Sequence, residues 1–383
     1  MIVGIPKETS ENERRVALIP PSIPTITKVG IQVLVESGAG VKAGFMDDEY
    51  EKKGAKIAKT HEEIFSLSDI ILQVRGLGAN PEGYSNDLKL MQKGQVVIGF
   101  FEPLYAPEII AQAAKRGIVA FSMELIPRIT RAQNMDALSS MATISGYKAV
   151  LLAAVNLPKM FPMLMTAAGT LLPARVFIIG AGVAGLQAIA TSKRLGAVVQ
   201  AYDVRPTVKD QVQSLGAKFV ELRLESQEAE DKDGYAKAMG EEFYQKQRAL
   251  MASVLKESDI VITTASVPGK KAPVLLTASM VKEMPRGSVI VDLAAEKGGN
   301  CELTKPSKSS EKYGISIIGP VNLPSSTPYH ASQMYAKNIT NFALLLIKDS
   351  KLQINLDDEI INQTLLTKDG NVVNNRVLEA LKS

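Results

Sequence analysis

The sequence predicts an α/β protein with two doubly wound parallel sheets. The chain has 383 residues, which is more than one hydrophobic core usually serves, so two domains are expected. In both halves, short runs of β-branched residues alternate with helical stretches, and this order requires crossover connections between parallel strands. Runs such as Val176–Ile179 are apolar on both faces, as expected where helices cover both sides of a sheet. We therefore expect two Rossmann-like domains separated by a cleft.

The expected strands are short and mostly apolar. In the first half they are Met1–Ile5, Gln32–Glu36, Ile70–Val74, Val96–Phe101 and Val119–Met123, with helices at Glu49–Thr60 and Pro107–Arg116. In the second half they are Arg175–Gly180, Val198–Asp203, Lys218–Val220, Asp259–Thr264, Ser288–Asp292 and Ser316–Gly319. The turn residues Thr367–Asn371 predict a late hairpin.

Two helical segments are expected to bridge the domains, one near residues 133–150 and the other near 331–347. The first domain is predicted to comprise residues 1–132 and 327–383, because a returning helix would bring the end of the chain back to it. The second domain is predicted to comprise residues 133–326.

Composition excludes several classes of function. The 44 Lys and Arg residues nearly balance the 40 Asp and Glu residues, so the charge gives no sign of a nucleic-acid partner. One cysteine, Cys301, excludes an intramolecular disulfide framework and a cysteine-based metal cage, and two histidines leave little for a metal site. The sequence contains no HExxH, Walker A or GxSxG motif. We expect no bound metal.

We also expect no membrane-spanning segment and no leader. The most apolar stretch, Ala149–Ala190, is interrupted by charged residues and prolines, and Met1–Pro6 already reads as a buried strand. These features predict a reducing, cytoplasm-like compartment.

A glycine motif predicts a dinucleotide site in the second half. The strand Arg175–Ile179 leads into Gly180-Ala181-Gly182-Val183-Ala184-Gly185 and then a helix. In this context the first glycine permits a tight turn, the second lets a pyrophosphate approach the backbone, and the third allows close packing of helix and strand. The first half has no matching glycines after Met1–Ile5, so no cofactor is expected there.

The acid that ends the next strand favours NAD(H). Asp203 lies 23 residues after Gly180, where a carboxylate binds the adenosine ribose hydroxyls and would repel the 2′-phosphate of NADP(H). Arg205 leaves NADP(H) open, because an arginine near this position can bind that phosphate. The cofactor contacts are predicted at Gly180, Gly182, Val183, Ala184, Gly185, Asp203, Val204, Arg205, Thr264 and Ala265.

Polar residues follow one face of the first bridging helix: Asp136, Ser139, Ser140, Thr143 and Tyr147. We expect this stripe to line the cleft, and the alternative is an ordinary solvated face. An acidic stretch between Leu222 and Leu250 interrupts the alternation of strands and helices. Its Tyr235 suggests a lid over the nucleotide, and the alternative is a solvated acidic loop.

The sequence offers few acid–base groups for catalysis. His61 follows Thr60 at a helix start and is expected to be exposed, while His330 begins the second bridging helix and could line the cleft. A dehydrogenase that acts on a hydroxyl or an amine needs a base for the accompanying proton. Hydride transfer between two nicotinamide rings needs none.

Several segments carry a family resemblance over essentially the full chain. They are Gly4–Glu8 with Arg15–Ala17, Pro127–Asp136, Met165–Thr170, Gly180–Gly185, Gly234–Glu242, Val267–Lys270 and Asp292–Ala294. The chain resembles the NAD(H)-binding component, domain I, of proton-translocating NAD(P) transhydrogenase, and more distantly alanine dehydrogenase. The resemblance implies direct hydride transfer from NADH to NADP⁺ on a partner subunit, coupled to proton translocation by a membrane subunit. It also implies a homodimer, located in the cytoplasm or a matrix-like compartment and attached peripherally to the inner membrane through those subunits.

The resemblance also implies roles for individual residues. Arg128 is similar to the cationic contact to the bound dinucleotide, and Gln133 to the side chain that reaches toward the NADP(H)-bearing partner. Asp136 and Ser139 are similar to residues that orient the nicotinamide, with Tyr147 on the same face.

Departures from alanine dehydrogenase favour the transhydrogenase. Glu102 stands where that enzyme places its catalytic histidine, and Arg75 replaces the lysine that helps hold the keto acid, although Arg15 is retained. The insertion at 222–250 is also a transhydrogenase feature, and Tyr235 matches the tip of the family's mobile loop. Two alternatives stay open, an amino-acid dehydrogenase of the alanine type and a non-catalytic NAD(H) sensor.

Overall fold

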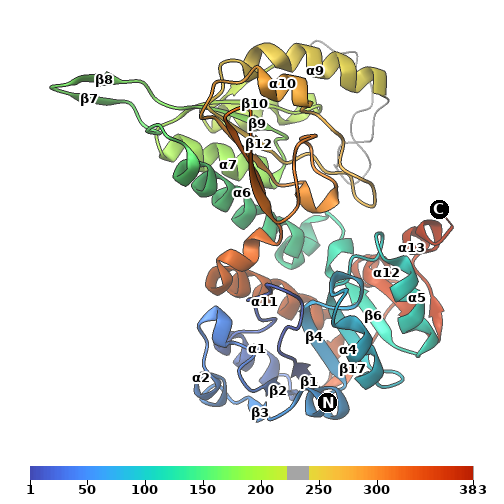
Figure 1. Ribbon diagram of the computed structural model, residues 1–383. Helices are drawn as coiled ribbons and strands as arrows, with labels where there is room; N and C mark the ends of the chain where they lie inside the picture. Colours follow the sequence, from blue (N-terminus) through green and yellow to red (C-terminus); the bar gives the residue numbers. More distant parts are fainter. Residues whose placement is uncertain (222–240, 383) are drawn as a thin grey trace. The chain divides into compact units, whose positions relative to one another are not determined.

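The computed structural model describes residues 1–221 and 241–382, and it divides into two compact units. Unit 1 comprises Met1–Met141 and Pro324–Ser383, and unit 2 comprises Ala142–Leu323. Each unit has its own sheet with helices around it (Figure 1). The predicted fold class, with two doubly wound and mainly parallel sheets, is confirmed.

Within the described residues, the unit 1 sheet has eight strands in the order β19-β18-β6-β5-β4-β1-β2-β3. Strands β1 to β6 are parallel, whereas β18 pairs antiparallel with β6 and with β19, which confirms the late hairpin. The strands are β1 (Ile2–Ile5), β2 (Gln32–Glu36), β3 (Lys56–Ala58), β4 (Ile70–Arg75), β5 (Val96–Phe100), β6 (Val119–Ser122), β18 (Leu365–Lys368) and β19 (Asn371–Val372). The strand order reverses between β1 and β4, and in open α/β sheets this switch point is where ligands bind.

The helices of unit 1 include one correction to the sequence prediction. They are α1 (Ile23–Thr27), α2 (Asp47–Glu51), α3 (His61–Leu67), α4 (Tyr84–Leu90), α5 (Pro107–Lys115), α11 (Pro328–Leu345), α12 (Glu359–Thr364) and α13 (Asn375–Ala380), and a short hairpin joins β16 (Ile347–Lys348) to β17 (Lys351–Leu352). The single helix expected at Glu49–Thr60 was wrong, because α2 ends at Glu51 and β3 follows. Gly54 between them has a φ of +95°, a left-handed conformation that no helix interior adopts.

The described part of unit 2 contains a seven-stranded sheet in the order β11-β10-β9-β12-β13-β15-β14. All its pairings are parallel except that of the edge strand β14. The strands are β9 (Arg175–Ile179), β10 (Val198–Tyr202), β11 (Lys218–Phe219), β12 (Ile260–Thr263), β13 (Val289–Asp292), β14 (Lys308–Lys312) and β15 (Ile315–Gly319), and the helices are α7 (Val183–Arg194), α8 (Lys209–Ser214), α9 (Glu241–Leu255) and α10 (Ala278–Lys282).

The central strand β9 shows why its sequence is apolar on both faces. Val176 and Ile178 pack into a buried cluster with residues of α6 (Ala137–Asn156) and α7. The intervening Phe177 and Ile179 pack into a second cluster with residues of α9 and α10 on the opposite face. Helices therefore cover both faces of this sheet, and β9 has no exposed side chain after Arg175.

Helix α6 corrects the expectation about membrane segments. Among the described helices, it is long and apolar enough to cross a membrane by length and composition, with a mean hydropathy of 1.4 and 33% of the window buried. The expectation failed because it weighed the stretch from Ala149 onward and took the small, neutral residues before it as a polar stripe. Core helices of soluble proteins satisfy the same criterion, so length and composition do not place α6 in a membrane.

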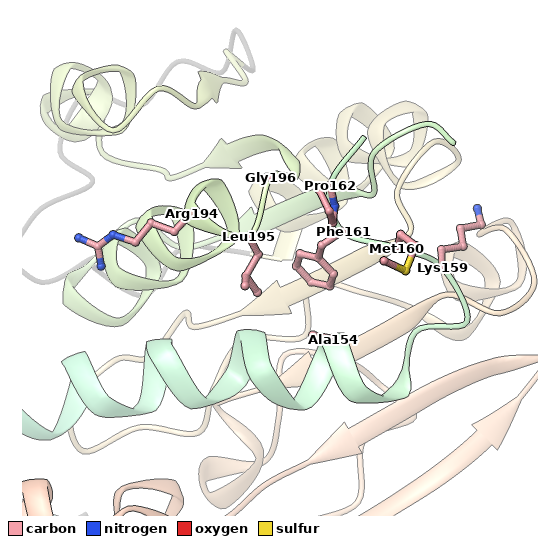
Figure 2. A pocket seen from close by; sticks show the side chains of 8 residues that line it. All are labelled: Ala154, Lys159, Met160, Phe161, Pro162, Arg194, Leu195 and Gly196. Atoms are coloured by element: carbon pink, nitrogen blue, oxygen red, sulfur yellow. The ribbon is translucent and has the colours of Figure 1, made fainter. Parts of the chain in front are cut away.

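An exposed apolar hairpin extends from unit 2, formed by β7 (Leu164–Thr166) and β8 (Gly169–Leu171) (Figure 1). Met165 is 77% exposed and Leu172 is 80% exposed. A shallow depression of about 570 Å³ lies at its base, lined by Ala154, Lys159, Met160, Phe161, Pro162, Arg194, Leu195 and Gly196 (Figure 2).

Candidate functional site

The glycine turn after β9 has the geometry that its sequence predicts. Gly180 adopts a φ of +98°, and a Cβ there would lie 2.4 Å from Thr264 Oγ1. A Cβ on Gly185 would lie 1.9 Å from the carbonyl oxygen of Gly180, so this glycine allows α7 to approach the turn. A Cβ on Gly182 would meet no atom within 4 Å, so the backbone at Gly182 borders open space.

The open space lies at the amino end of α7. Gly182 precedes the helix, provides no side-chain cap, and no acidic residue lies in the first turn. The first N–H groups of a helix have no intrahelical acceptor, and the helix dipole is positive at this end. The turn can therefore bind a phosphate through the backbone around Val183 and Ala184.

Glycine also sets how α6 meets this region. A Cβ on Gly146 would lie 2.1 Å from the carbonyl oxygen of Ala184, so α6 packs directly against the first turn of α7. Gly146 was not among the predicted site residues, although a glycine inside a long helix is a signal of close packing.

Asp203 is connected to the glycine turn. Its carboxylate directly follows β10, is 8% exposed, and accepts the backbone N–H of Ala181 at 2.7 Å. It also accepts the N–H of Arg205 at 2.9 Å and two N–H groups of the Arg205 guanidinium at 3.0 Å each. The structure thus brings together two predicted cofactor residues and the turn, with Val204 between them.

The loop after β12 completes this edge of the sheet. Thr264 Oγ1 donates to the carbonyl oxygen of Gly180 at 3.1 Å, and Ala265 N–H donates to Asn300 Oδ1 at 3.0 Å. Because β9 and β12 flank the switch point of unit 2, both predicted residues lie where a nucleotide is expected.

Two buried polar residues that the site prediction missed hold this loop. The Asn300 amide donates to the carbonyl oxygens of Ala265 and Pro273, each at 2.9 Å. Asp292, which is completely buried, accepts the backbone N–H of Asn300 at 2.8 Å and the hydroxyl of Thr263 at 2.9 Å. An acid directly after an apolar strand was the available signal for Asp292, whereas no local pattern identifies Asn300.

In unit 1, Asp136 and Ser139 form a helix cap. Asp136 directly precedes α6, and its carboxylate accepts the N–H of Ser139 at 2.8 Å and the Ser139 hydroxyl at 2.5 Å. This contact satisfies one of the unpaired donors at the helix start. The predicted pair is therefore brought together, and its local role is to begin α6.

The segment with Arg128 and Gln133 is anchored by neighbouring helices. The carbonyl oxygen of Asn134 accepts the amides of Asn338 and Asn341 of α11, at 2.9 and 3.1 Å. Arg131 Nη1 and Nη2 donate to the two carboxylate oxygens of Asp358 at 2.7 and 2.8 Å, and Asp358 caps α12. The side chains of Arg128 and Gln133 are exposed.

The remaining predicted residues lie elsewhere. Tyr147, in unit 2, is 43% exposed and follows Ser139 and Thr143 at four-residue steps along α6. Tyr235 lies outside the described residues. The insertion predicted at 222–250 is not entirely loop, because α9 begins at Glu241.

The switch point of unit 1 is filled by the chain itself. The Glu8 carboxylate follows β1 and accepts the backbone N–H groups of Val74 and Arg75 on β4 at 2.6 and 3.0 Å. Burial and the nearby Glu13 raise the pKa of Glu8 to about 8. Glu13 in turn forms a buried ion pair with Arg15, at 2.6 Å.

A second buried acid lies after β6. Glu124 accepts the backbone N–H groups of Phe101 and Glu102 at 2.7 and 2.8 Å and the Ser122 hydroxyl at 2.5 Å. Burial, and then the charge of Glu102, raise the pKa of Glu124 to about 7.

The expectation that His61 is exposed was wrong. Thr60 does cap α3, but the His61 ring lies between Glu36, at 2.7 Å from Nδ1, and Asp87, at 3.0 Å from Nε2. Burial alone would lower the pKa of His61, whereas the hydrogen bonds to Asp87 and Glu36 raise it to about 10. His61 is thus a structural cation, and His330 is exposed at the start of α11.

The described residues contain no group of three or more His, Cys, Asp or Glu side chains that could hold a metal ion. Cys301 is a buried free thiol whose pKa burial raises to about 11.

Two family models together match nearly the whole chain. The model "Alanine dehydrogenase/PNT, N-terminal domain" matches residues 4–145, and "Alanine dehydrogenase/PNT, C-terminal domain" matches residues 149–375.

Individual proteins give the same result. The chain is 44% identical to the first of the separate polypeptides that form NAD(P) transhydrogenase subunit alpha in Rickettsia prowazekii (strain Madrid E), covering 98% of this chain and 97% of that protein. A solved structure of transhydrogenase from Sinorhizobium meliloti is similar with a TM-score of 0.84 at 41% identity, covering 98% of this chain and 99% of that one. A structure of L-alanine dehydrogenase has a TM-score of 0.82 at 25% identity, covering 100% and 99%.

Proposed function

We propose, from the premise that the chain belongs to the alanine dehydrogenase/PNT family, that it is the NAD(H)-binding component of a proton-translocating NAD(P) transhydrogenase. The coarser assignment, a component of an NAD(P) transhydrogenase, stands on the similarity to an alpha-subunit polypeptide over 98% of the chain. In the finer proposal, a hydride passes directly from NADH to NADP⁺ on a partner subunit, and a membrane subunit couples this transfer to proton translocation.

One observation carries the NAD(H) assignment, namely the open backbone at Gly182 beside the carboxylate of Asp203. The amino end of α7 fits a pyrophosphate, and Asp203, joined to the same turn through Ala181, fits the ribose hydroxyls. Thr264 and Ala265 border the same edge of the sheet. The residues present therefore fit NAD(H), which when bound would supply the hydride.

The chain's own contribution to the reaction is binding and orientation. Transfer between two nicotinamide rings moves no proton, so it needs a fixed geometry rather than an acid or a base. The anchored 3₁₀ helix Thr130–Met135 presents the exposed side chain of Gln133, which suits contact with a second protein. We assign orientation of the nicotinamide to Arg128, Asp136, Ser139 and Tyr147, and closure on the nucleotide to Tyr235.

The buried acids of unit 1 disfavour the amino-acid dehydrogenase alternative. A keto acid is an anion and needs a cation with spare charge, but Arg15 is paired with Glu13 inside the protein. Glu8 and Glu124 add two further buried carboxyl groups to this unit. An anionic substrate would meet uncompensated negative charge here whenever these groups ionise.

The hairpin β7–β8 supports a homodimer. A strand pair with apolar side chains as exposed as Met165 and Leu172 is unusual on a monomer and suits contact with a second copy. We propose that the dimer lies in the cytoplasm or a matrix-like compartment and attaches to the inner membrane through its partner subunits.

A reconstitution tests the proposal. Mixed with NADH, NADP⁺ and a purified NADP(H)-binding transhydrogenase subunit, the protein should form NADPH at a rate that depends on both proteins. Without that subunit, NADH with pyruvate and ammonium should stay unoxidised. Steady oxidation in the second mixture would establish the dehydrogenase, and NADH binding without transfer in the first would favour the non-catalytic sensor.

A further inference from the structure

We propose that Arg205 is an exchangeable partner of Asp203, and that its guanidinium competes with the adenosine ribose hydroxyls for the Asp203 carboxylate. Arg205 would then lower the affinity for NADH, although it lies in the nucleotide site. This inference rests on the proposed binding of NAD(H) and concerns which side chain limits it.

The inference begins with the full occupancy of the carboxylate. Asp203 Oδ1 accepts the backbone N–H of Arg205 at 2.9 Å and Arg205 Nε at 3.0 Å. Oδ2 accepts the backbone N–H of Ala181 at 2.7 Å and Arg205 Nη2 at 3.0 Å. An ionised carboxylate has about four acceptor positions, so the four donors fill it.

Two of these donors are fixed by the backbone. Ala181 lies between Gly180, which has a φ of +98°, and Gly182 at the start of α7, so its N–H cannot turn away without rebuilding the glycine turn. The N–H of Arg205 is held by the short segment after β10. Only the guanidinium can leave by side-chain rotation.

A ribose diol would need the positions that the guanidinium fills. Its two hydroxyls bind a carboxylate by donating to both oxygens, in the same way as the two N–H groups of an arginine fork. Because the backbone donors stay, nucleotide binding exchanges the guanidinium for the diol. Part of the energy of diol binding is then spent on breaking the Asp203–Arg205 pair.

Burial explains why a protein would keep this competitor. The Asp203 side chain is 5% exposed and that of Arg205 is 12% exposed. A carboxylate this buried is strongly destabilising without a counter-charge. Arg205 supplies that charge until the nucleotide arrives.

The exchange also predicts opposite roles in selectivity. A 2′-phosphate would be repelled by Asp203 and attracted by the released guanidinium. Removing Arg205 should therefore raise the affinity for NADH and lower that for NADPH.

Calorimetry on the full chain tests this with three ligands: NADH, NADPH and an NADH analogue without the 2′-hydroxyl of the adenosine ribose. The variants are Arg205→Ala and Arg205→Lys, because lysine keeps the charge but lacks the fork. Arg175→Ala is the matched control, since it removes an exposed arginine–glutamate pair at the amino edge of the same sheet. Thermal melting without ligand establishes that each variant is folded.

For Arg205→Ala we expect the Kd of NADH to fall about three- to tenfold, with a smaller fall for the analogue and a rise for NADPH. Arg205→Lys should lie between Arg205→Ala and the unmodified protein, and it decides the question if Arg205→Ala does not fold. An unchanged or higher Kd of NADH would overturn the inference, because the guanidinium would then be neutral toward the nucleotide or in favourable contact with it. If the unmodified protein binds no NADH, the proposed function fails first.

Discussion

The carboxylate of Asp203, which follows β10, accepts the backbone N–H of Ala181 in the turn after β9, at 2.7 Å. The group expected to hold the ribose therefore also fixes the turn expected to hold the pyrophosphate. The two subsites are mechanically one, because neither can move without the other. This coupling makes Asp203 the most informative position in the nucleotide site.

Asp203→Ala should weaken NADH binding by about tenfold or more, because it removes both the ribose acceptor and the acceptor of the Ala181 N–H. Calorimetry gives the Kd, and the exposed Asp210 on α8 provides a control, Asp210→Ala, with the same change of charge. Equal NADH affinity in Asp203→Ala and Asp210→Ala would remove Asp203 from the site.

The motif glycines separate binding from folding. Gly182→Ala should melt at nearly the temperature of the unmodified protein, since its Cβ meets no atom within 4 Å, but it should lose NADH affinity because the methyl group enters the phosphate space. Gly185→Ala should instead lower the melting temperature by several degrees, because its Cβ would lie 1.9 Å from the Gly180 carbonyl oxygen. If both variants lost only stability, the space at Gly182 would not be a binding site.

Gln133→Ala should leave NADH affinity nearly unchanged and slow hydride transfer in the reconstituted complex. Its side chain is exposed, whereas the backbone of its 3₁₀ helix is anchored to α11 through Asn134. Stopped-flow measurement of transfer and calorimetry of NADH binding separate the two effects. Equal losses in both would place Gln133 in the nucleotide site instead of at the partner surface.

The strands next to the switch points could be predicted because their signals are local. β9 and β12 are runs of apolar residues long enough for buried strands, and the glycine spacing fixes the turn that follows β9. The edge strand β14 could not be found in this way, since Lys308–Lys312 is polar and forms a strand only by pairing with β15. The hairpin β7–β8 also has no buried face to create a pattern.

Residues that act through distant partners were missed for a related reason. Asn300 holds Ala265 from 35 positions away along the chain, and His61 meets Glu36 and Asp87 from 25 and 26 positions away. Composition and spacing do not encode such contacts. Asp136 shows a different limit, because one carboxylate can cap α6 and also face a ligand, and the sequence pattern is the same for both roles.

His61 should stay charged across neutral pH. Its pKa of about 10 in the folded protein lies above the ordinary 6.5, so its contribution to stability is complete below about pH 6.5 and is lost as the pH rises toward 10. His330→Gln leaves His61 as the only histidine of the chain, so one set of ring signals can be followed by NMR. These signals should not shift between pH 6 and 8, and a titration with a midpoint near 6.5 would show that the contacts with Glu36 and Asp87 are absent in solution.

Glu124→Gln should stabilise the protein at alkaline pH. The pKa of Glu124 is raised from 4.5 to about 7 by burial and by Glu102, so the unfolded chain ionises first and stability falls as the pH rises from about 4.5 to 7. Glutamine can keep the contacts with the N–H groups of Phe101 and Glu102 through its carbonyl oxygen, but it cannot ionise. The melting temperature of Glu124→Gln should therefore exceed that of the unmodified protein increasingly between pH 5 and 8, toward a difference of roughly 3 kcal/mol in unfolding free energy. Glu108→Gln, at an exposed position on α5, controls for the change of charge, and a difference that does not vary with pH would mean that Glu124 is already ionised in the folded protein.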